Sequence, residues 1–466
     1  MREIHIAERD TGSALNGAAA WGATAPGNWP APQAAREPNS LPSPPRGRAR
    51  PLVPAGNRVG PAVVFLYSHD TFGLGHLRRN LAIAERLLES GQFAVHLLTG
   101  SPVISQWHLP PGLHVHPMPP VVKTGAERYA ARDAAKAFAL VKGYRSALIL
   151  TLALRYRPDV FLVDHAPAGM NGELLPALAM MRRELPDTRI MLGLRDILDS
   201  PEIVRATWAE QDIAPLLEQA YDDILVYGSR ALFDVVDAYG IAPPTAARVR
   251  YCGHVVAADL VRPVSETQAP CWNQTRAQGR PVVLVTAGGG GDGFALMDAY
   301  LAACRQTPPG TWHSVIVTGP LMSAAQRDTL STAAAGRDDI ELIDYLTDPL
   351  PSLRAADLVI AMAGYNTSAE LIAARKRAII VPRPAPRAEQ RLRAALLARL
   401  GLVRVIEQGP ELAAQLGGAI PAVLAAPPAP EAAWTQLDLN GAERVAAHLT
   451  TTLEARAAAD LTWETA

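Results

Sequence analysis

The sequence has few cysteines, no long apolar run and no excess of positive charge. Its three cysteines, Cys252, Cys271 and Cys304, are far apart, which argues against a disulfide framework and a thiolate metal site and indicates free thiols in a reducing compartment. The apolar runs fall well short of the ~20 residues that a membrane-spanning helix requires. A net charge of -1 offers no positive field to nucleic-acid phosphates. We therefore expect no disulfides, no membrane span and no nucleic-acid partner.

The N-terminal region has neither an export signal nor a regular period. Charges begin at the second residue and no apolar core follows, so we expect a cytoplasmic protein. Residues 1–60 are rich in Pro, Ala, Gly and Arg, which predicts a disordered extension. A docking arm that uses Arg46, Arg48 and Arg50 is the alternative.

The remaining sequence has the pattern of two α/β domains. Of the 466 residues, 49% are hydrophobic, and the chain is too long for one typical core. Strand-like runs alternate with helical segments from PAVVFLY at 61–67, and the pattern restarts with PVVLVT at 281–286, which predicts two doubly wound parallel sheets. The predicted parts are the extension at 1–60, an N-terminal Rossmann-like domain at 61–262, a linker at 263–279, a C-terminal Rossmann-like domain at 280–430 and a helical tail at 431–466.

Candidate site residues follow the predicted strands, because ligands of such sheets bind beyond the carboxyl ends of the strands. In SHDTFGLGH, Gly73 and Gly75 permit close backbone approach, and His76 begins a helix, where an imidazole suits general base work near neutral pH. Asp70 is a second candidate for the base. A capping role for His76 and backbone bonding for Asp70 are the structural alternatives.

Three segments of the second domain carry further candidates. Four successive glycines at 288–291 present amides at a helix N-terminus, which suits a nucleotide diphosphate, with a flexible loop as the alternative. In AGYNTSAE, Glu370 could accept both hydroxyls of a ribose, or could form a capping box with Thr367. Glu389 and Gln390 open a helix after AIIVP and could reach ligand hydroxyls, with solvated polar groups as the alternative.

In this order, the motifs resemble glycosyltransferase family 28, the family of the bacterial MurG-type enzymes. FGLGH at 72–76 resembles the Gly-rich loop whose histidine is a candidate base there. The run from Asp344, DYLTDPLPSLRAADLVIAMAGYNTSAELIAARKRAIIVPRP, followed by EQRLRAALLARLGLVRVIEQ, parallels the nucleotide-binding half of that family. The loop YSHDTFGLGHLRRNLAIAERL is more similar still to a bacterial group of predicted glycosyltransferases. The resemblance implies a GT-B-like fold, with two Rossmann-type domains facing across a cleft.

The resemblance also implies a reaction and a set of donor contacts. The reaction is transfer of a hexosyl group from a UDP-linked nucleotide sugar onto an acceptor hydroxyl. An N-acetylhexosaminyl group is among the candidates for the group transferred. Glu370 would bind the ribose, and Gln390 the donor sugar or the ribose. The predicted diphosphate contacts are Gly288, Gly289, Gly290, Gly291, Gly364, Asn366, Thr367 and Ser368.

The acceptor side departs from the family pattern. DHAPAGMNGELLP at 164–176 and LRDILDSP at 194–201 do not resemble the lipid-acceptor loops of MurG-type enzymes, so the acceptor stays open between lipid-linked molecules and polysaccharides. The cleft candidates here are Asp164, His165, Arg195 and Asp196, with backbone-bonded loop residues as the alternative.

The expected chemistry needs no cofactor. No DxD-type motif stands out, so we expect no essential metal, and helix dipoles and basic side chains would stabilise the leaving diphosphate. The family implies peripheral contact with the inner face of the membrane. The alternatives are a nucleotide-sugar epimerase of the same fold and a non-catalytic nucleotide-sugar-binding protein.

Overall fold

The computed structural model describes residues 60–70, 75–102, 104–106, 109–123, 129–133, 137–256, 279–346, 349–385 and 387–464, with side chains as far as 456. Almost all of the predicted N-terminal extension and of the predicted linker lies outside these residues, as do Gly73 and Cys271.

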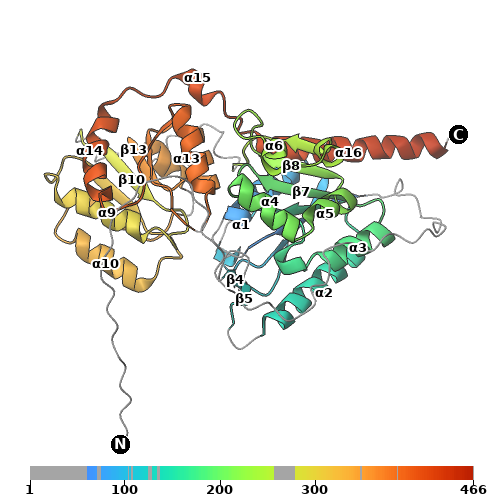
Figure 1. Ribbon diagram of the computed structural model, residues 1–466. Helices are drawn as coiled ribbons and strands as arrows, with labels where there is room; N and C mark the ends of the chain where they lie inside the picture. The colour runs from blue at the N-terminus through green and yellow to red at the C-terminus, as the bar shows by residue number, and fades with distance from the viewer. Residues whose placement is uncertain are drawn as a thin grey trace, which may run out of the picture. The chain divides into compact units, whose positions relative to one another are not determined.

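Seven parallel strands form the first sheet, in the order β3-β2-β1-β6-β7-β8-β9 (Figure 1). The order reverses between β1 and β6, as in a doubly wound sheet, and such a reversal opens a crevice for ligands. The strands are β1 (Ala62–Ser68), β2 (Phe93–Thr99), β3 (His114–Pro117), β6 (Val160–Asp164), β7 (Arg189–Arg195), β8 (Asp223–Tyr227) and β9 (Val249–Tyr251), and a separate antiparallel pair comprises β4 (Val121–Lys123) and β5 (Tyr129–Ala131).

Two layers of helices bury this sheet, because alternate side chains of each strand point to opposite faces. Phe65 belongs to the cluster that includes residues of α2, α3 and α5, whereas Val64 belongs to the cluster that includes Leu77 of α1 and Val445 of α16. Figure 1 shows α16, in red, beside the first sheet. The helices are α1 (Gly75–Glu89), α2 (Phe138–Tyr156), α3 (Leu175–Glu184), α4 (Pro201–Glu210), α5 (Ile213–Ala220), α6 (Val235–Tyr239), α7 (Pro243–Ala246) and α16 (Gly441–Glu464), with short helices η2 (Ile104–Gln106) and η3 (Met170–Gly172).

Six parallel strands form the second sheet, in the order β12-β11-β10-β13-β14-β15. Here the order reverses between β10 and β13. The strands are β10 (Val282–Thr286), β11 (His313–Val317), β12 (Ile340–Ile343), β13 (Leu358–Ala361), β14 (Ala378–Ile380) and β15 (Val403–Val405). The helices that follow or cover them are α9 (Phe294–Arg305), α10 (Ala324–Ala334), α11 (Leu350–Ala355), α12 (Tyr365–Ala374), α13 (Glu389–Arg399), α14 (Leu412–Ala425) and α15 (Glu431–Trp434).

The same alternation builds the second core. Val283 and Val285 pack with residues of α9, α10 and α14, whereas Val282 and Leu284 pack with residues of α11, α12 and α13. None of the described helices combines the length and apolar character that crossing a bilayer would require.

Candidate active site

A cavity of about 230 Å³ is lined by residues from both halves of the chain. Its walls come from the carboxyl ends of β1, β7, β10, β11, β12, β13 and β14 and the segments that follow them, close to both strand-order reversals. Of the predicted site residues, those that line it are Gly75, His76, Arg195, Gly288, Gly289, Gly290, Gly291, Gly364, Asn366, Thr367, Glu370, Glu389 and Gln390.

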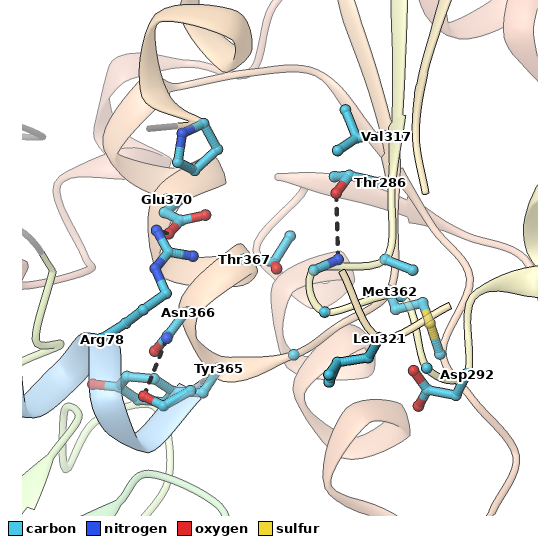
Figure 2. Close-up of a pocket in the computed structure, with 18 of the residues that line it drawn as sticks. Arg78, Thr286, Asp292, Val317, Leu321, Met362, Tyr365, Asn366, Thr367 and Glu370 are labelled. Atoms are coloured by element: carbon cyan, nitrogen blue, oxygen red, sulfur yellow. Dashed lines mark hydrogen bonds and ion pairs between the residues drawn. The ribbon is translucent and has the colours of Figure 1, made fainter. Parts of the chain in front are cut away.

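The glycine-rich loop after β10 is held in one conformation by its neighbours. Gly290 has a φ of +84°, and a Cβ there would lie 1.9 Å from the carbonyl oxygen of Thr318, so only glycine fits. The amide of Gly288 donates to the hydroxyl of Thr286 at 3.3 Å (Figure 2). The loop therefore presents backbone at close range to the cavity instead of forming a loose surface turn.

Helix α12 points its N-terminus at the same cavity. The helix begins at Tyr365 with Gly364 in the cap position, and none of the described side chains caps it. The capping box of Thr367 and Glu370 is therefore wrong, because Thr367 lies within the first turn. The uncapped N–H groups and the positive end of the helix dipole suit an anion such as a phosphate.

Glu370 and Asn366 of this helix contact the first half. Arg78 of α1 forms an ion pair with the buried Glu370, and the amide nitrogen of Asn366 donates to the carbonyl of Gly75 at 3.2 Å (Figure 2). The carboxylate predicted to receive a ribose is thus paired with a guanidinium.

His76 forms a dyad with Asp164. Its Nδ1 lies 2.6 Å from Oδ2 of Asp164, at the end of β6, and its side chain is 13% exposed. Arg79 holds the same carboxylate with bonds of 2.7 and 2.9 Å from Nη2. A carboxylate beside Nδ1 favours the tautomer in which Nδ1 carries the proton, which leaves Nε2 as an acceptor.

Burial and neighbouring charges together set the charges of His76 and Asp164. It lowers the pKa of His76 to about 4, against the opposing effect of Asp164. Burial alone would raise the pKa of Asp164, but Arg79 and His76 lower it to about 2. Since Arg79 already neutralises the carboxylate, we conclude that His76 is neutral near pH 7 and able to accept a proton.

Asp70 and His165 do not line the cavity. Asp70 is buried and accepts a hydrogen bond from the hydroxyl of Thr99, and burial raises its pKa to about 6. The ring of His165 lies 5.2 Å from that of His76, centre to centre, and burial lowers its pKa. His165 has a φ of +72°, and its buried Nδ1 has no hydrogen-bond partner among the described residues.

The last residue of β7 lines the cavity, and the segment after it holds the two halves together. Arg195 lines the cavity. Asp196 instead forms a buried ion pair with Arg393 of α13, with bonds of 2.7 and 2.9 Å, and Arg393 also donates to the carbonyl of Ala363 at 2.8 Å. Asp196 was predicted to face the cleft, but its side chain is engaged in this contact.

The start of α13 lies at the cavity as predicted. Arg383 pairs with Glu389 at 2.6 Å and with Asp292 at 3.0 Å. The backbone amide of Arg383 donates to the side-chain oxygen of Gln390 at 3.2 Å. The second oxygen of Glu389 is buried without a hydrogen-bond partner among the described residues, so it can accept from a ligand.

Comparison with known proteins identifies the family of the chain. The family profile of the glycosyltransferase family 28 C-terminal domain matches residues 282–449. A UDP-N-acetylglucosamine--N-acetylmuramyl-(pentapeptide) pyrophosphoryl-undecaprenol N-acetylglucosamine transferase from Sorangium cellulosum is 30% identical over 63% of this chain and 69% of that protein. The chain belongs to glycosyltransferase family 28.

Another relative is matched over less of its length. The transferase of the same name from Burkholderia vietnamiensis is 27% identical over 52% of this chain and 64% of that protein, so the match spans less than two thirds of it.

Solved structures support the fold. The MurG of Acinetobacter baumannii has a TM-score of 0.52 at 15% identity, over 84% of this chain and 100% of that one. A putative UDP-N-acetylglucosamine 2-epimerase from Listeria monocytogenes has a TM-score of 0.56 at 15% identity, over 85% of this chain and 97% of that one. The fold of this family 28 chain is GT-B.

Several cavity residues of this family 28 chain escaped the sequence prediction. In the sequence, Arg78 and Arg79 are typical of the polar face of a helix. Nothing in their spacing indicates that Arg78 reaches Glu370 and Arg79 reaches Asp164. Arg393, which pairs with Asp196 and does not line the cavity, was also missed because it lies inside a helical run. Among the described residues, no group of three or more His, Cys, Asp or Glu side chains is arranged to hold a metal ion.

Proposed function

We propose that this family 28 protein transfers a hexosyl group from a UDP-sugar to a hydroxyl acceptor. The observation that carries the proposal is one cavity that joins a neutral, oriented His76 to a glycine loop, an uncapped helix N-terminus and the carboxylate of Glu370. Family membership supports glycosyl transfer, and the names of the relatives make UDP-N-acetylglucosamine the first donor to test.

The donor would bind mainly to the second half. Its diphosphate would accept hydrogen bonds from the amides at residues 288–291 and at the start of α12. Its ribose hydroxyls would donate to Glu370 after Arg78 has moved away from that carboxylate. We propose that no divalent metal takes part, since the helix N-terminus and the surrounding arginines supply positive charge where the leaving diphosphate gains negative charge.

The base would be Nε2 of His76. The acceptor oxygen attacks the anomeric carbon, the bond from that carbon to the phosphate oxygen breaks, and its electron pair leaves with UDP. The acceptor proton passes to Nε2, while Nδ1 donates to Asp164, which holds the ring in the orientation that leaves Nε2 free to accept.

A lipid-linked acceptor is our candidate, with the protein held at a membrane surface. The relatives' printed acceptor carries an undecaprenol chain. Helix α2 exposes Leu140 by 73%, Tyr144 by 61% and Leu154 by 47%, and residues four and fourteen positions after Leu140 share its helical face. Arg155 and Arg157 are exposed beside them, which suits anionic headgroups. Vesicles of phosphatidylglycerol should co-sediment the wild type, and a Leu140→Ser, Tyr144→Ser variant should stay in the supernatant.

Calorimetric titration with UDP, UMP, ADP and GDP tests the donor site. We expect selective binding of UDP that Glu370→Ala weakens strongly, with Glu407→Ala, which alters a largely exposed carboxylate outside the cavity, as the control. If the protein shows no preference among the four nucleotides, the proposal is refuted.

Two further assays separate transfer from its alternatives. Incubation with a UDP-sugar alone should leave the sugar configuration unchanged, whereas an epimerase would produce an isomeric UDP-sugar. In an acceptor screen, His76→Ala should bind UDP normally and lose transfer. A binding protein without catalytic activity would show no turnover even as the wild type.

A further inference from the structure

Four arginines line the cavity, and three of them have carboxylate partners. The pairs are Arg78 with Glu370, Arg79 with Asp164, and Arg383 with both Asp292 and Glu389. These three guanidinium groups are neutralised before any ligand arrives.

Arg195 is the exception. None of the described acidic side chains forms an ion pair with it, and its Nε is buried without a hydrogen-bond partner among the described residues. Burial and the charges of Arg79, Arg387 and Arg393 lower its pKa to about 10, and Glu389, already bound to Arg383, opposes them. The group therefore stays protonated at neutral pH. An unpaired guanidinium in the partly buried wall of a cavity destabilises the folded protein unless an anion pairs with it.

The backbone beside Arg195 is fixed, which sets the position of this charge. The next residue, Asp196, forms the buried ion pair with Arg393, and the carboxylate of Asp199 accepts from the backbone amide of Ala388 at 2.8 Å. Both contacts tie the segment to the start of α13. A cation that is held in place before the ligand binds needs little reorganisation to stabilise an anion.

We propose that Arg195 is a catalytic residue of the first half that binds the diphosphate of the donor. The inference rests on the proposed function, since it takes the anion in this cavity to be a nucleoside diphosphate. The glycine loop and the α12 N-terminus then hold the diphosphate from one wall and Arg195 from the other. A donor without phosphate charge would gain nothing from Arg195.

Arg195→Met tests this with UDP and uridine as calorimetric probes. We expect the dissociation constant for UDP to rise about 10- to 100-fold, the range of one lost charged hydrogen bond, and that for uridine to change less than about twofold. Arg391→Met is the matched control, because Arg391 is half-exposed, pairs with Glu407 and lies outside the cavity. This control should bind both probes as the wild type does.

Thermal melting of the same proteins gives a second readout that a structural arginine would not produce. Removal of an unpaired buried charge should raise the melting temperature of ligand-free Arg195→Met above that of the wild type, while the rise caused by UDP should shrink. A structural role predicts a lower melting temperature instead.

The outcomes separate the two proposals. If the wild type binds UDP and Arg195→Met binds it equally well, the role of Arg195 is refuted and the proposed function stands. Equal weakening of UDP and uridine also refutes it, since the contact would then be to the nucleoside or to the fold. If the wild type does not bind UDP, the proposed function fails and this inference fails with it.

Discussion

Selective isotope labelling of the histidine rings can measure the charge of His76 directly. Burial lowers the pKa of this ring to about 4, and the carboxylate of Asp164 at 2.6 Å opposes that effect. Because Arg79 binds the same carboxylate, little of its negative charge remains to stabilise an imidazolium. We therefore expect His76 to be about 3% protonated at pH 5.5, where an ordinary imidazole is about 90% protonated.

The assay is a two-dimensional NMR titration of the ring signals from pH 8 to pH 5. The His76→Gln variant identifies the signal of His76 by its loss. A peptide that carries the surrounding sequence supplies the reference for an unburied ring. The shifts of His76 should stay those of a neutral, Nδ1-protonated imidazole throughout. A midpoint at or above pH 6.5 would refute the reasoning, because it would mean that the charge of Asp164 outweighs burial.

The lowered pKa of His76 also makes the free energy of unfolding depend on pH. The direction follows from the number of protons that the folded and unfolded states bind. Between pH 6.5 and about pH 4 the unfolded chain protonates this histidine and the folded protein does not, so the free energy of unfolding falls as the pH is lowered, by up to about 3 kcal/mol. Asp70 acts in the opposite direction, because its pKa is raised to about 6 and the folded state binds the extra proton there. Comparing the wild type with His76→Gln by urea unfolding at pH 7 and pH 5 isolates the histidine.

Three substitutions test other parts of the site. Arg78→Ala should lower the dissociation constant for UDP about fivefold by calorimetry, since it removes a cation whose pairing with the donor carboxylate is worth about 1 kcal/mol. Asp196→Ala should lower the free energy of unfolding in urea by about 3–5 kcal/mol, because Arg393 would stay buried without its counter-ion. Gly290→Ala should lower the melting temperature and weaken UDP binding, because its Cβ would collide with the carbonyl of Thr318.

Matched controls make these results interpretable. Arg230→Ala removes an exposed ion pair with Asp234 and should leave the free energy of unfolding nearly unchanged. Gly417→Ala adds a methyl group in α14 where nothing lies within 4 Å, and it should be neutral or stabilising. Unchanged UDP affinity in Arg78→Ala would show that the ion pair does not compete with the ribose. If Asp196→Ala were as stable as the wild type, the Arg393 pair would contribute nothing to stability.

Much of the fold could be predicted because its central strands are buried on both faces. Runs such as PVVLVT can be recognised as strands from their continuous apolar character, without alternating polar residues. They are bounded by glycine-rich turns. The edge strands β3, β9 and β15 escaped, since they have three or four residues and carry polar side chains such as His114, His116 and Arg404. The edge strand β12 (IELI) is as short, but three of its four residues are β-branched or Leu, and that apolar run could still be recognised.

The sequence predicted which segments form the site, but not which side chains pair with one another there. Position after a strand pointed correctly to the cavity for His76, the glycine loop and Glu370. The choice of Asp164 as partner of His76, rather than Asp70, depends on how β1 and β6 lie side by side, which the sequence does not state. For the same reason Arg78 could not be told apart from a solvated helix residue.

The place of α16 bears on how the chain folds during synthesis. Val445 and Leu449 of this helix complete the cluster around Leu77 and Leu81, although the whole second sheet is translated between them. The first half therefore emerges from the ribosome with part of one face of its core uncovered and stays so until α16 has been made. A truncated chain that ends before α16 would leave that apolar face open, and its failure would be aggregation during expression instead of a defect in catalysis.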